Sequence, residues 1–177
     1  MNAQPSAARR AELEKDVRID WYHGDRVALR PLFALAEDSP AELESYLMTG
    51  RVLVASSSGD LVGHLHLVDT GTPGHAEIKN MAVREDLRGR GIGRSLVREA
   101  LARLAAENVV GVRVATATAD IGNLRFYQRL GFRMRSIERD AFTESTGYPP
   151  GILIDGIPLR DRVWLDLPLV TPAEQTR

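Results

Sequence analysis

The sequence predicts a mixed α/β domain, with a central mixed sheet of about seven strands and about four helices flanking its faces. Two observations support this class. Strand-like runs dominate residues 51–83, and strand-like and helix-like segments then alternate in the order β–α–β–α–β. The 177-residue length suits one domain with a sizeable core. We place that domain at residues 16–170, between a flexible N-terminal tail (1–15) and a C-terminal tail (171–177).

The first half of the chain contains four predicted strands and two predicted helices. Residues 17–22 alternate in polarity and predict a strand, and the apolar spacing of residues 25–37 predicts a helix. A capping box with proline at residues 39–42 predicts a second helix, which runs to about residue 48. Three further strands are expected at residues 51–57, 61–69 and 75–83, the first two joined as a hairpin.

The second half alternates between helices and strands. An amphipathic pattern predicts a long helix from about residue 92, with Leu96, Ala100 and Leu104 on its apolar face. A β-rich run follows at residues 109–116. The next helix is capped by Asp120 or Asn123. The remaining segments are a strand at 132–139, a Gly/Pro-rich connection at 140–160 and a final strand at 163–169.

Composition excludes several classes of function. The chain has no cysteine, which excludes disulfides, thiolate metal sites and a cysteine nucleophile. Its formal net charge of −1 gives no reason to expect nucleic acid as a partner. No signal-like or membrane-spanning apolar run is present, so we expect a cytoplasmic protein without a membrane partner. The oligomeric state is left open, a homodimer included.

Two histidines share one face of a predicted strand. His64 and His66 lie two residues apart, and no third metal ligand accompanies them. We therefore expect no metal site. Packing or a polar sheet face is the favoured interpretation, and His66 is kept as a candidate contact to an acceptor molecule.

The turn before the long helix has the features of an anion-binding site. Glycines there can expose backbone N–H groups, the helix N-terminus aims those groups at a ligand, and arginines add positive charge. The dinucleotide fingerprint fails because Arg94 occupies its last glycine position, and no Walker sequence is present. An ordinary strand–helix turn with solvated arginines is the alternative. The residues concerned are Arg88, Gly89, Arg90, Gly91, Ile92, Gly93 and Arg94.

Two motifs together resemble the GCN5-related N-acetyltransferase (GNAT) family. The first is the RxxGxG pattern from Arg88 to Gly93, which is similar to the family's acyl-CoA pyrophosphate loop. The second places Asn123 before Tyr127, Gly131 and Phe132, in the family's order. The resemblance covers roughly residues 50–135. It implies the GNAT fold, acetyl-CoA as the donor of an acetyl group, and an amine as the acceptor.

The resemblance also implies roles for particular residues. The Tyr127 hydroxyl would protonate the departing thiolate, the alternative being a packed tyrosine. Glu77 would accept the amine proton, directly or through water, the alternative being a surface ion pair. Asn123 would bind the pantetheine arm, a helix cap being the alternative. The backbone of Met81, Ala82 and Val83 would pair with that arm.

Charge guides the expectation for the acceptor. Residues 37–44 hold four acids and no base, and residues 138–161 hold five acids against two arginines. In the family these regions wall the acceptor site, so two acidic walls would attract a small cationic amine; solvated acidic faces are the alternative. Residues 140–167 also resemble a subgroup that includes kasugamycin N-acetyltransferase. The candidate acceptor contacts are Glu37, Asp38, His66, Asp140, Glu144, Tyr148 and Asp155.

These observations favour an N-acetyltransferase that acts on an aminoglycoside such as kasugamycin. Acetylation of a protein N-terminus or lysine is an alternative within the same class. A non-catalytic acyl-CoA-binding module is an alternative of another class.

Overall fold

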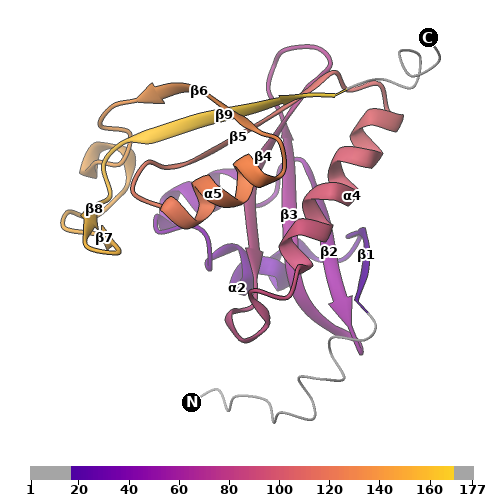
Figure 1. Cartoon of the computed structure of the whole chain (residues 1–177). Helices are drawn as coiled ribbons and strands as arrows, with labels where there is room; N and C mark the ends of the chain where they lie inside the picture. Colours follow the sequence, from indigo (N-terminus) through magenta and orange to yellow (C-terminus); the bar gives the residue numbers. More distant parts are fainter. Residues whose placement is uncertain (1–16, 170–177) are drawn as a thin grey trace.

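A computed structural model describes residues 17–169; the predicted tails at 1–15 and 171–177 lie outside the described residues. Its centre is a seven-stranded sheet of order β1-β2-β3-β4-β5-β9-β6, in which only β4 and β5 are parallel (Figure 1). This confirms the predicted mixed sheet. The strands are β1 (Arg18–Trp21), β2 (Arg51–Ser57), β3 (Asp60–Asp69), β4 (His75–Val83), β5 (Gly111–Ala117), β6 (Arg133–Glu138) and β9 (Arg162–Pro168).

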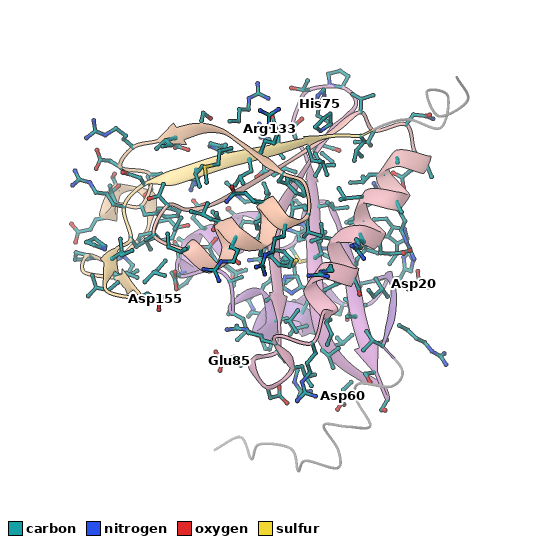
Figure 2. All side chains as sticks on the ribbon, in the orientation of Figure 1. Asp20, Asp60, His75, Glu85, Arg133 and Asp155 are labelled. Atoms are coloured by element: carbon teal, nitrogen blue, oxygen red, sulfur yellow. The ribbon has the colours of Figure 1, made fainter. Side chains whose placement is uncertain are left out.

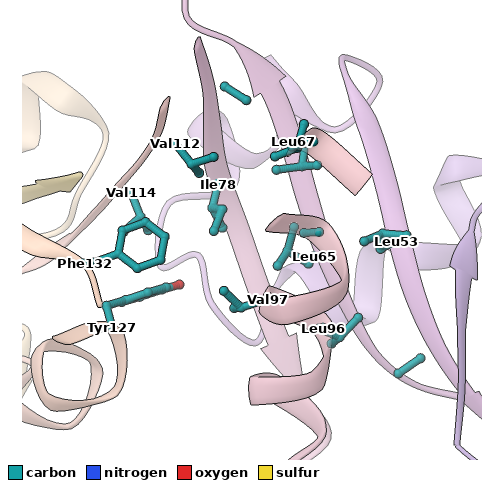
Figure 3. Close-up of a cluster of buried hydrophobic side chains, with 14 of the residues drawn as sticks. Leu53, Leu65, Leu67, Ile78, Leu96, Val97, Val112, Val114, Tyr127 and Phe132 are labelled. Atoms are coloured by element: carbon teal, nitrogen blue, oxygen red, sulfur yellow. The ribbon is translucent and has the colours of Figure 1, made fainter. Parts of the chain in front are cut away.

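Helices cover both faces of the sheet. On one face, α4 (Ile92–Ala106) and α5 (Ile121–Arg129) enclose the larger core, to which α4 contributes Leu96 and Val97 and α5 contributes Tyr127 (Figure 3). On the other face, α2 (Arg30–Phe33) and α3 (Pro40–Tyr46) form a second, smaller core with Val52 and Val54 of β2, and α2 also contacts β3 and β4. The four α-helices within residues 17–169 agree with the predicted number of about four.

The helix predicted at residues 25–37 is wrong as one continuous element. The chain forms a 3-10 turn at Arg26–Leu29 and then the four-residue α2, which ends at Phe33. Pro31 accounts for the break. It has no amide hydrogen to donate to the carbonyl four residues earlier, and its ring crowds that carbonyl. The apolar spacing nevertheless predicts correctly which side of this segment is buried, since Leu29, Leu32 and Phe33 all lie in the interior.

The connection predicted at residues 140–160 contains short local structure. It includes a 3-10 turn at Glu144–Thr146 and a small hairpin of β7 (Leu153–Ile154) and β8 (Ile157–Pro158). The connection then leads into β9, which lies between β5 and β6.

Strand β4 carries an extra residue at Lys79. Asn80 lies opposite His66, whereas Ile78 lies opposite Leu67, so Lys79 has no partner on β3. This bulge reverses the alternation of side chains along the strand. Ile78 therefore faces the larger core, while Asn80 points to the opposite face and hydrogen-bonds to groups of α2 and α3.

The parallel strands β4 and β5 separate half-way along their length. Their pairing begins at His75↔Gly111 and ends at Ile78↔Val114. Beyond that point β4 is paired only with β3, and β5 only with β9. In Figure 1, β5, β9 and β6 run across the direction of β1–β4. The inner edge of β4 after Ile78 thus presents backbone N–H and C=O groups that no strand in residues 17–169 takes up.

Candidate active site

A cleft of about 720 Å³ opens where β4 and β5 separate. Residues 79–83 of β4 and residues 115–117 of β5 line its middle. One end reaches the turn before α4. The other end lies between the segment that follows α2 and the connection before β9. The cleft therefore joins the two regions that the sequence assigned to the donor and to the acceptor.

The turn before α4 has the backbone geometry of an anion cradle. Gly89 and Gly91 have φ of 78° and 86°, a left-handed region that favours glycine, and a Cβ atom at either position would meet nothing within 4 Å. Gly91 caps α4 without a side-chain hydrogen bond, and the first turn of the helix holds no acid. The N–H groups at this helix start are therefore suited to bind an anion from the cleft.

The arginines of this turn differ in position. Arg88 lines the cleft, and its Nε donates to the Val83 carbonyl at 3.1 Å, which fixes the start of the side chain while half of it stays exposed. Arg94 also lines the cleft, whereas Arg90 does not. The predicted donor-site residues that line the cleft are Met81, Ala82, Val83, Arg88, Gly89, Gly91, Ile92, Gly93, Arg94 and Asn123.

Tyr127 presents a protonated phenol to the cleft. Its ring packs edge-on against Phe126 and Phe132, and Figure 3 shows the hydroxyl directed toward the strand that carries Ile78. Burial raises the pKa of Tyr127, and nearby Asp120 raises it further. The hydroxyl makes no hydrogen bond to any described residue, so its proton is available to a ligand.

Asp120, not Asn123, is the N-cap of α5. Its carboxylate accepts from the Asn123 backbone N–H at 2.8 Å and from the Asn123 side-chain amide at 2.7 Å. The amide oxygen of Asn123 has no such partner among the described residues. The amide oxygen of Asn123 is therefore able to accept a hydrogen bond from a ligand in the cleft, and Asp120 caps the helix.

Glu77 lies in the cleft wall and is also ion-paired. Its Oε2 accepts from Arg113 Nε at 2.8 Å and from Arg113 Nη2 at 2.7 Å. The two residues face each other in the paired part of β4 and β5, and the Arg113 guanidinium stacks over Trp164. Both contacts use one carboxylate oxygen, so Oε1 remains for a water or a ligand. This geometry is compatible with both roles considered for Glu77, acceptor of the amine proton and partner in an ion pair.

Only one of the two acid-rich segments lines the acceptor end. Glu37, Asp38 and Glu42 line the cleft. From the second segment, Asp140 pairs with Arg160, Glu144 begins a 3-10 turn, and Asp155 occupies the tight turn of the β7–β8 hairpin (Figure 2). None of these three acids lines the cleft, because turn geometry and local pairing hold them elsewhere. The connection instead contributes Phe142, Tyr148, Ile154 and Leu159.

Lys79 and Asn80 lie at the acceptor end and are not predicted there from the sequence. Lys79 on the bulge lines the cleft, and its Nζ lies 5.0 Å from the ring centroid of Tyr46. Asn80 lines the cleft and donates to the Tyr46 hydroxyl at 2.8 Å. A lysine and an asparagine within an apolar strand were the available signal, but only the bulge reveals where they point.

His66 lies in the interior and not in the cleft. Both His64 and His66 are fully buried, and His66 Nε2–H donates to the Thr49 carbonyl at 2.7 Å. His64 stacks on Phe33. Burial lowers the pKa of His64 to about 3 and that of His66 to about 4. The packing interpretation fits this placement, and the acceptor contact proposed for His66 does not.

The buried histidines predict acid sensitivity of the fold. In the unfolded chain each binds a proton near pH 6.5, whereas the folded pKa values of about 3 and 4 keep both neutral. Their contribution is therefore fully present above pH 6.5 and is lost as the pH falls toward 4, by up to about 1.4 kcal/mol per pH unit for each histidine. Urea denaturation across this range measures the slope. His64→Gln should make it shallower, and an unchanged slope would contradict the assignment.

No metal or membrane feature accompanies the cleft. Within residues 17–169, no three His, Asp or Glu side chains are placed to hold a metal ion. In the same part of the chain, no helix has both the length and the apolar character needed to cross a membrane.

A model of the acetyltransferase (GNAT) family matches residues 13–132. The chain belongs to the GNAT family. It is 33% identical over 153 residues to the uncharacterized N-acetyltransferase YvbK of Bacillus subtilis, which covers 85% of this chain and 97% of that protein.

Solved structures of family members share the GNAT fold. An IAA acetyltransferase from Bacillus cereus superposes with a TM-score of 0.79 at 33% identity, covering 87% of this chain and all of that one. A Bacillus subtilis acetyltransferase in complex with CoA also gives a TM-score of 0.79, at 32% identity, with 88% of this chain and 100% of that one covered. The sheet and helices of this chain are therefore those of a GNAT acetyltransferase.

Proposed function

We propose that this GNAT chain transfers the acetyl group of acetyl-CoA to a primary amine of a small cationic acceptor. The observation that carries the proposal is the unpaired inner edge of β4, which runs from the glycine turn to the acid-lined end within one cleft. An extended donor can pair with such an edge as an added strand would. The same edge brings the acetyl group to the acceptor.

The residues present fit acetyl-CoA. The turn from Arg88 to Arg94 offers open backbone N–H groups and cationic side chains for a pyrophosphate. On the side of β4 that faces away from β3, the stretch of residues 81–83 offers peptide groups that β5 does not pair, and these suit the amides of a pantetheine arm. When bound, acetyl-CoA supplies the acetyl group as a reactive thioester.

Two side chains move the protons in this proposal. Glu77, through its free Oε1, accepts a proton from the acceptor nitrogen, directly or through water. The nitrogen then forms a bond to the acetyl carbon while the carbon–sulfur bond breaks. The Tyr127 hydroxyl gives its proton to the departing sulfur, and the second proton that the nitrogen loses as it becomes an amide returns through water to the Tyr127 oxygen. A lysine-like amine with a pKa of about 10.4 needs such a base near pH 7.

The acceptor end favours an amine attached to an apolar or sugar body. Glu37, Asp38 and Glu42 supply negative charge on one side, and aromatic and aliphatic side chains of the connection before β9 supply the other side. An aminoglycoside such as kasugamycin remains the finer form of the proposal, now supported by one acidic wall in place of two. The mixed lining also favours a monoamine with an aromatic body.

A panel of acceptors tests the proposal. Kasugamycin, spermidine, tyramine and a peptide with one free amine are incubated with acetyl-CoA, and free thiol and product mass are measured. We expect kasugamycin or another small amine to be acetylated faster than the peptide. Turnover of the peptide alone would point to protein acetylation. Tight acetyl-CoA binding without turnover of any amine would indicate a binding module.

The role of Glu77 is tested against its own ion-pair partner. We expect Glu77→Gln to lower kcat/KM by about 10- to 100-fold near pH 7, and less as the pH approaches the amine pKa, because deprotonated amine then needs no base. Arg113→Gln also breaks the ion pair but keeps the carboxylate. Arg113→Gln should lose as much thermal stability as Glu77→Gln does, but its kcat/KM should keep the wild-type dependence on pH. Identical pH profiles for the two variants would leave Glu77 a structural role only.

A further inference from the structure

The carboxylate of Glu37 is held by three hydrogen bonds at the acceptor end of the cleft. Oε1 accepts from the Ser39 backbone N–H at 3.0 Å and from the Tyr148 hydroxyl at 2.9 Å, and Oε2 accepts from the Tyr46 hydroxyl at 3.1 Å. A carboxylate offers about four acceptor positions, so one position, on Oε2, remains. The neighbouring acids Asp38 and Glu42 line the same cleft, and their carboxylates accept no hydrogen bond from any residue within 17–169.

The hydrogen bond from Tyr46 is the last of a directed chain that begins in the interior. His64 Nε2–H donates to Asn80 Oδ1 at 2.8 Å, since that oxygen can only accept. The Asn80 amide donates to the Tyr46 hydroxyl at 2.8 Å, so the Tyr46 proton is directed to Glu37. His64 Nδ1 has no partner, which agrees with a neutral ring protonated at Nε2.

The donors in this chain keep their protons over the working pH range. Burial raises the pKa of Tyr46 and of Tyr148, and it lowers that of His64 to about 3. Every donor direction is therefore fixed, and successive hydrogen bonds of one direction reinforce each other. His64 on β3, Asn80 on β4 and Tyr46 on α3 thus fix the direction of the one acceptor site on Glu37 Oε2 that remains open to a ligand.

The Tyr148–Glu37 bond also joins the two sides of the acceptor end. Gly147, next to Tyr148, approaches Ser39 so closely that an added Cβ atom would lie 2.7 Å from its Oγ. Ser39 is fully buried beneath this contact. The segment after α2 and the connection before β9 are therefore held at a fixed spacing around Glu37.

We infer that Glu37 binds the ammonium group of the acceptor, and that Tyr46, Asn80 and Tyr148 are the positioning residues that aim its free oxygen position. The inference rests on the proposed amine acetylation and names the residue that recognises the amine. An acid fixed in advance binds a cation at lower entropic cost than a mobile one. That difference separates Glu37 from Asp38, which is exposed and unrestrained.

Binding and kinetics of matched variants test the inference. Spermidine and kasugamycin are titrated calorimetrically into the CoA-saturated protein, and acceptor KM and kcat are measured wherever acetylation occurs. We expect Glu37→Gln to weaken amine binding and raise acceptor KM by about 10- to 100-fold, with acetyl-CoA affinity unchanged. Asp38→Asn removes a charge from the same wall that no hydrogen bond positions, and it should weaken amine binding and raise acceptor KM clearly less than Glu37→Gln does.

Two tyrosine variants separate positioning from packing. Tyr46→Phe keeps the ring but removes the hydroxyl from the chain, and we expect a rise of about three- to tenfold in acceptor KM. Tyr22→Phe removes a hydroxyl from the same smaller core, where it donates to the Asp25 carbonyl, and should leave acceptor KM unchanged. Equal acceptor KM for both variants would remove Tyr46 as a positioning residue.

The remaining outcomes are also decisive. If the wild type binds neither amine, or if Glu37→Gln binds both as the wild type does, the inference is overturned. If Glu37→Gln and Asp38→Asn lose amine affinity equally, the acceptor is attracted by the summed negative charge of the wall and not by one positioned carboxylate, which would overturn the inference. Amine binding that depends on Glu37, without acetylation of any amine, would overturn the proposed function while the recognition site stands.

Discussion

Gly91→Asp is expected to abolish binding of acetyl-CoA, with a loss of at least about 100-fold in affinity. The substitution places a carboxylate at the N-terminus of α4, where the proposed donor site would place phosphate against the backbone donors and Arg88. It also adds a side chain at φ 86°, a conformation that non-glycine residues rarely adopt. Calorimetric titration of acetyl-CoA measures the effect directly.

Two controls separate charge from backbone strain. Gly91→Ala introduces the strain without the charge, and its Cβ atom meets nothing within 4 Å, so a smaller loss of affinity is expected. Gly59→Asp carries the same substitution in the β2–β3 turn, at φ 83° and also in open space. It should reproduce the loss of stability and retain wild-type affinity. Wild-type affinity in Gly91→Asp itself would refute the assignment of the turn.

Tyr127→Phe is expected to lower kcat by about 10²- to 10⁴-fold while acetyl-CoA affinity stays within about threefold of wild type. Phenylalanine retains the edge-on packing with Phe126 and Phe132 and removes only the hydroxyl. Because that hydroxyl makes no hydrogen bond to a described residue, its loss leaves no protein group unsatisfied. The variant should therefore fold with wild-type thermal stability.

Rapid-mixing kinetics are needed to assign this effect to chemistry. A single-turnover experiment with acetyl-CoA already bound measures acetyl transfer separately from product release. We expect the single-turnover rate to fall in parallel with kcat. A wild-type single-turnover rate would return Tyr127 to a packing role and leave the departing thiolate to be protonated by water.

Local patterns predicted the strands because each pattern lies within one segment. The run of residues 51–57 and the run of residues 75–83 appear in the structure with the predicted bounds, since β-branched residues and turn residues define them. The turn at Ser58 and Gly59 has positive φ at both residues, as its composition favours. The donor end of the cleft is also local, because its cradle is one continuous stretch of sequence.

The acceptor end depends on contacts between distant residues, which periodicity does not specify. Glu37 and Tyr148 are 111 residues apart in sequence and hydrogen-bonded in space. Tyr46 lies within the helix predicted to run to about residue 48 and Asn80 within the strand predicted at residues 75–83, but such a pattern gives a residue's face and not its partner. The bulge at Lys79, which decides the direction of Asn80, has no sequence signature comparable to a glycine turn.

The acids of residues 138–161 illustrate the same limit. The composition of the segment correctly shows that it is acidic. The path of the chain, however, turns Asp140 and Asp155 away from the cleft and directs Tyr148 into it. A charge count over a long connection averages over side chains that point in opposite directions. The contacts that settle their directions are tertiary.

The position of β9 affects the order in which the protein forms during synthesis. Within residues 17–169, β9 is the last strand of the sheet along the chain, yet it lies between β5 and β6 and supplies the pairing partner of β6. On the ribosome, β1–β4 and the glycine turn emerge well before residues 162–168, and they can form their local antiparallel pairs early. Until β9 emerges, β5 and β6 each present an unpaired edge to other nascent chains. The donor end can therefore take shape while translation continues, whereas the acceptor end is completed only after the connection before β9 and β9 itself have emerged.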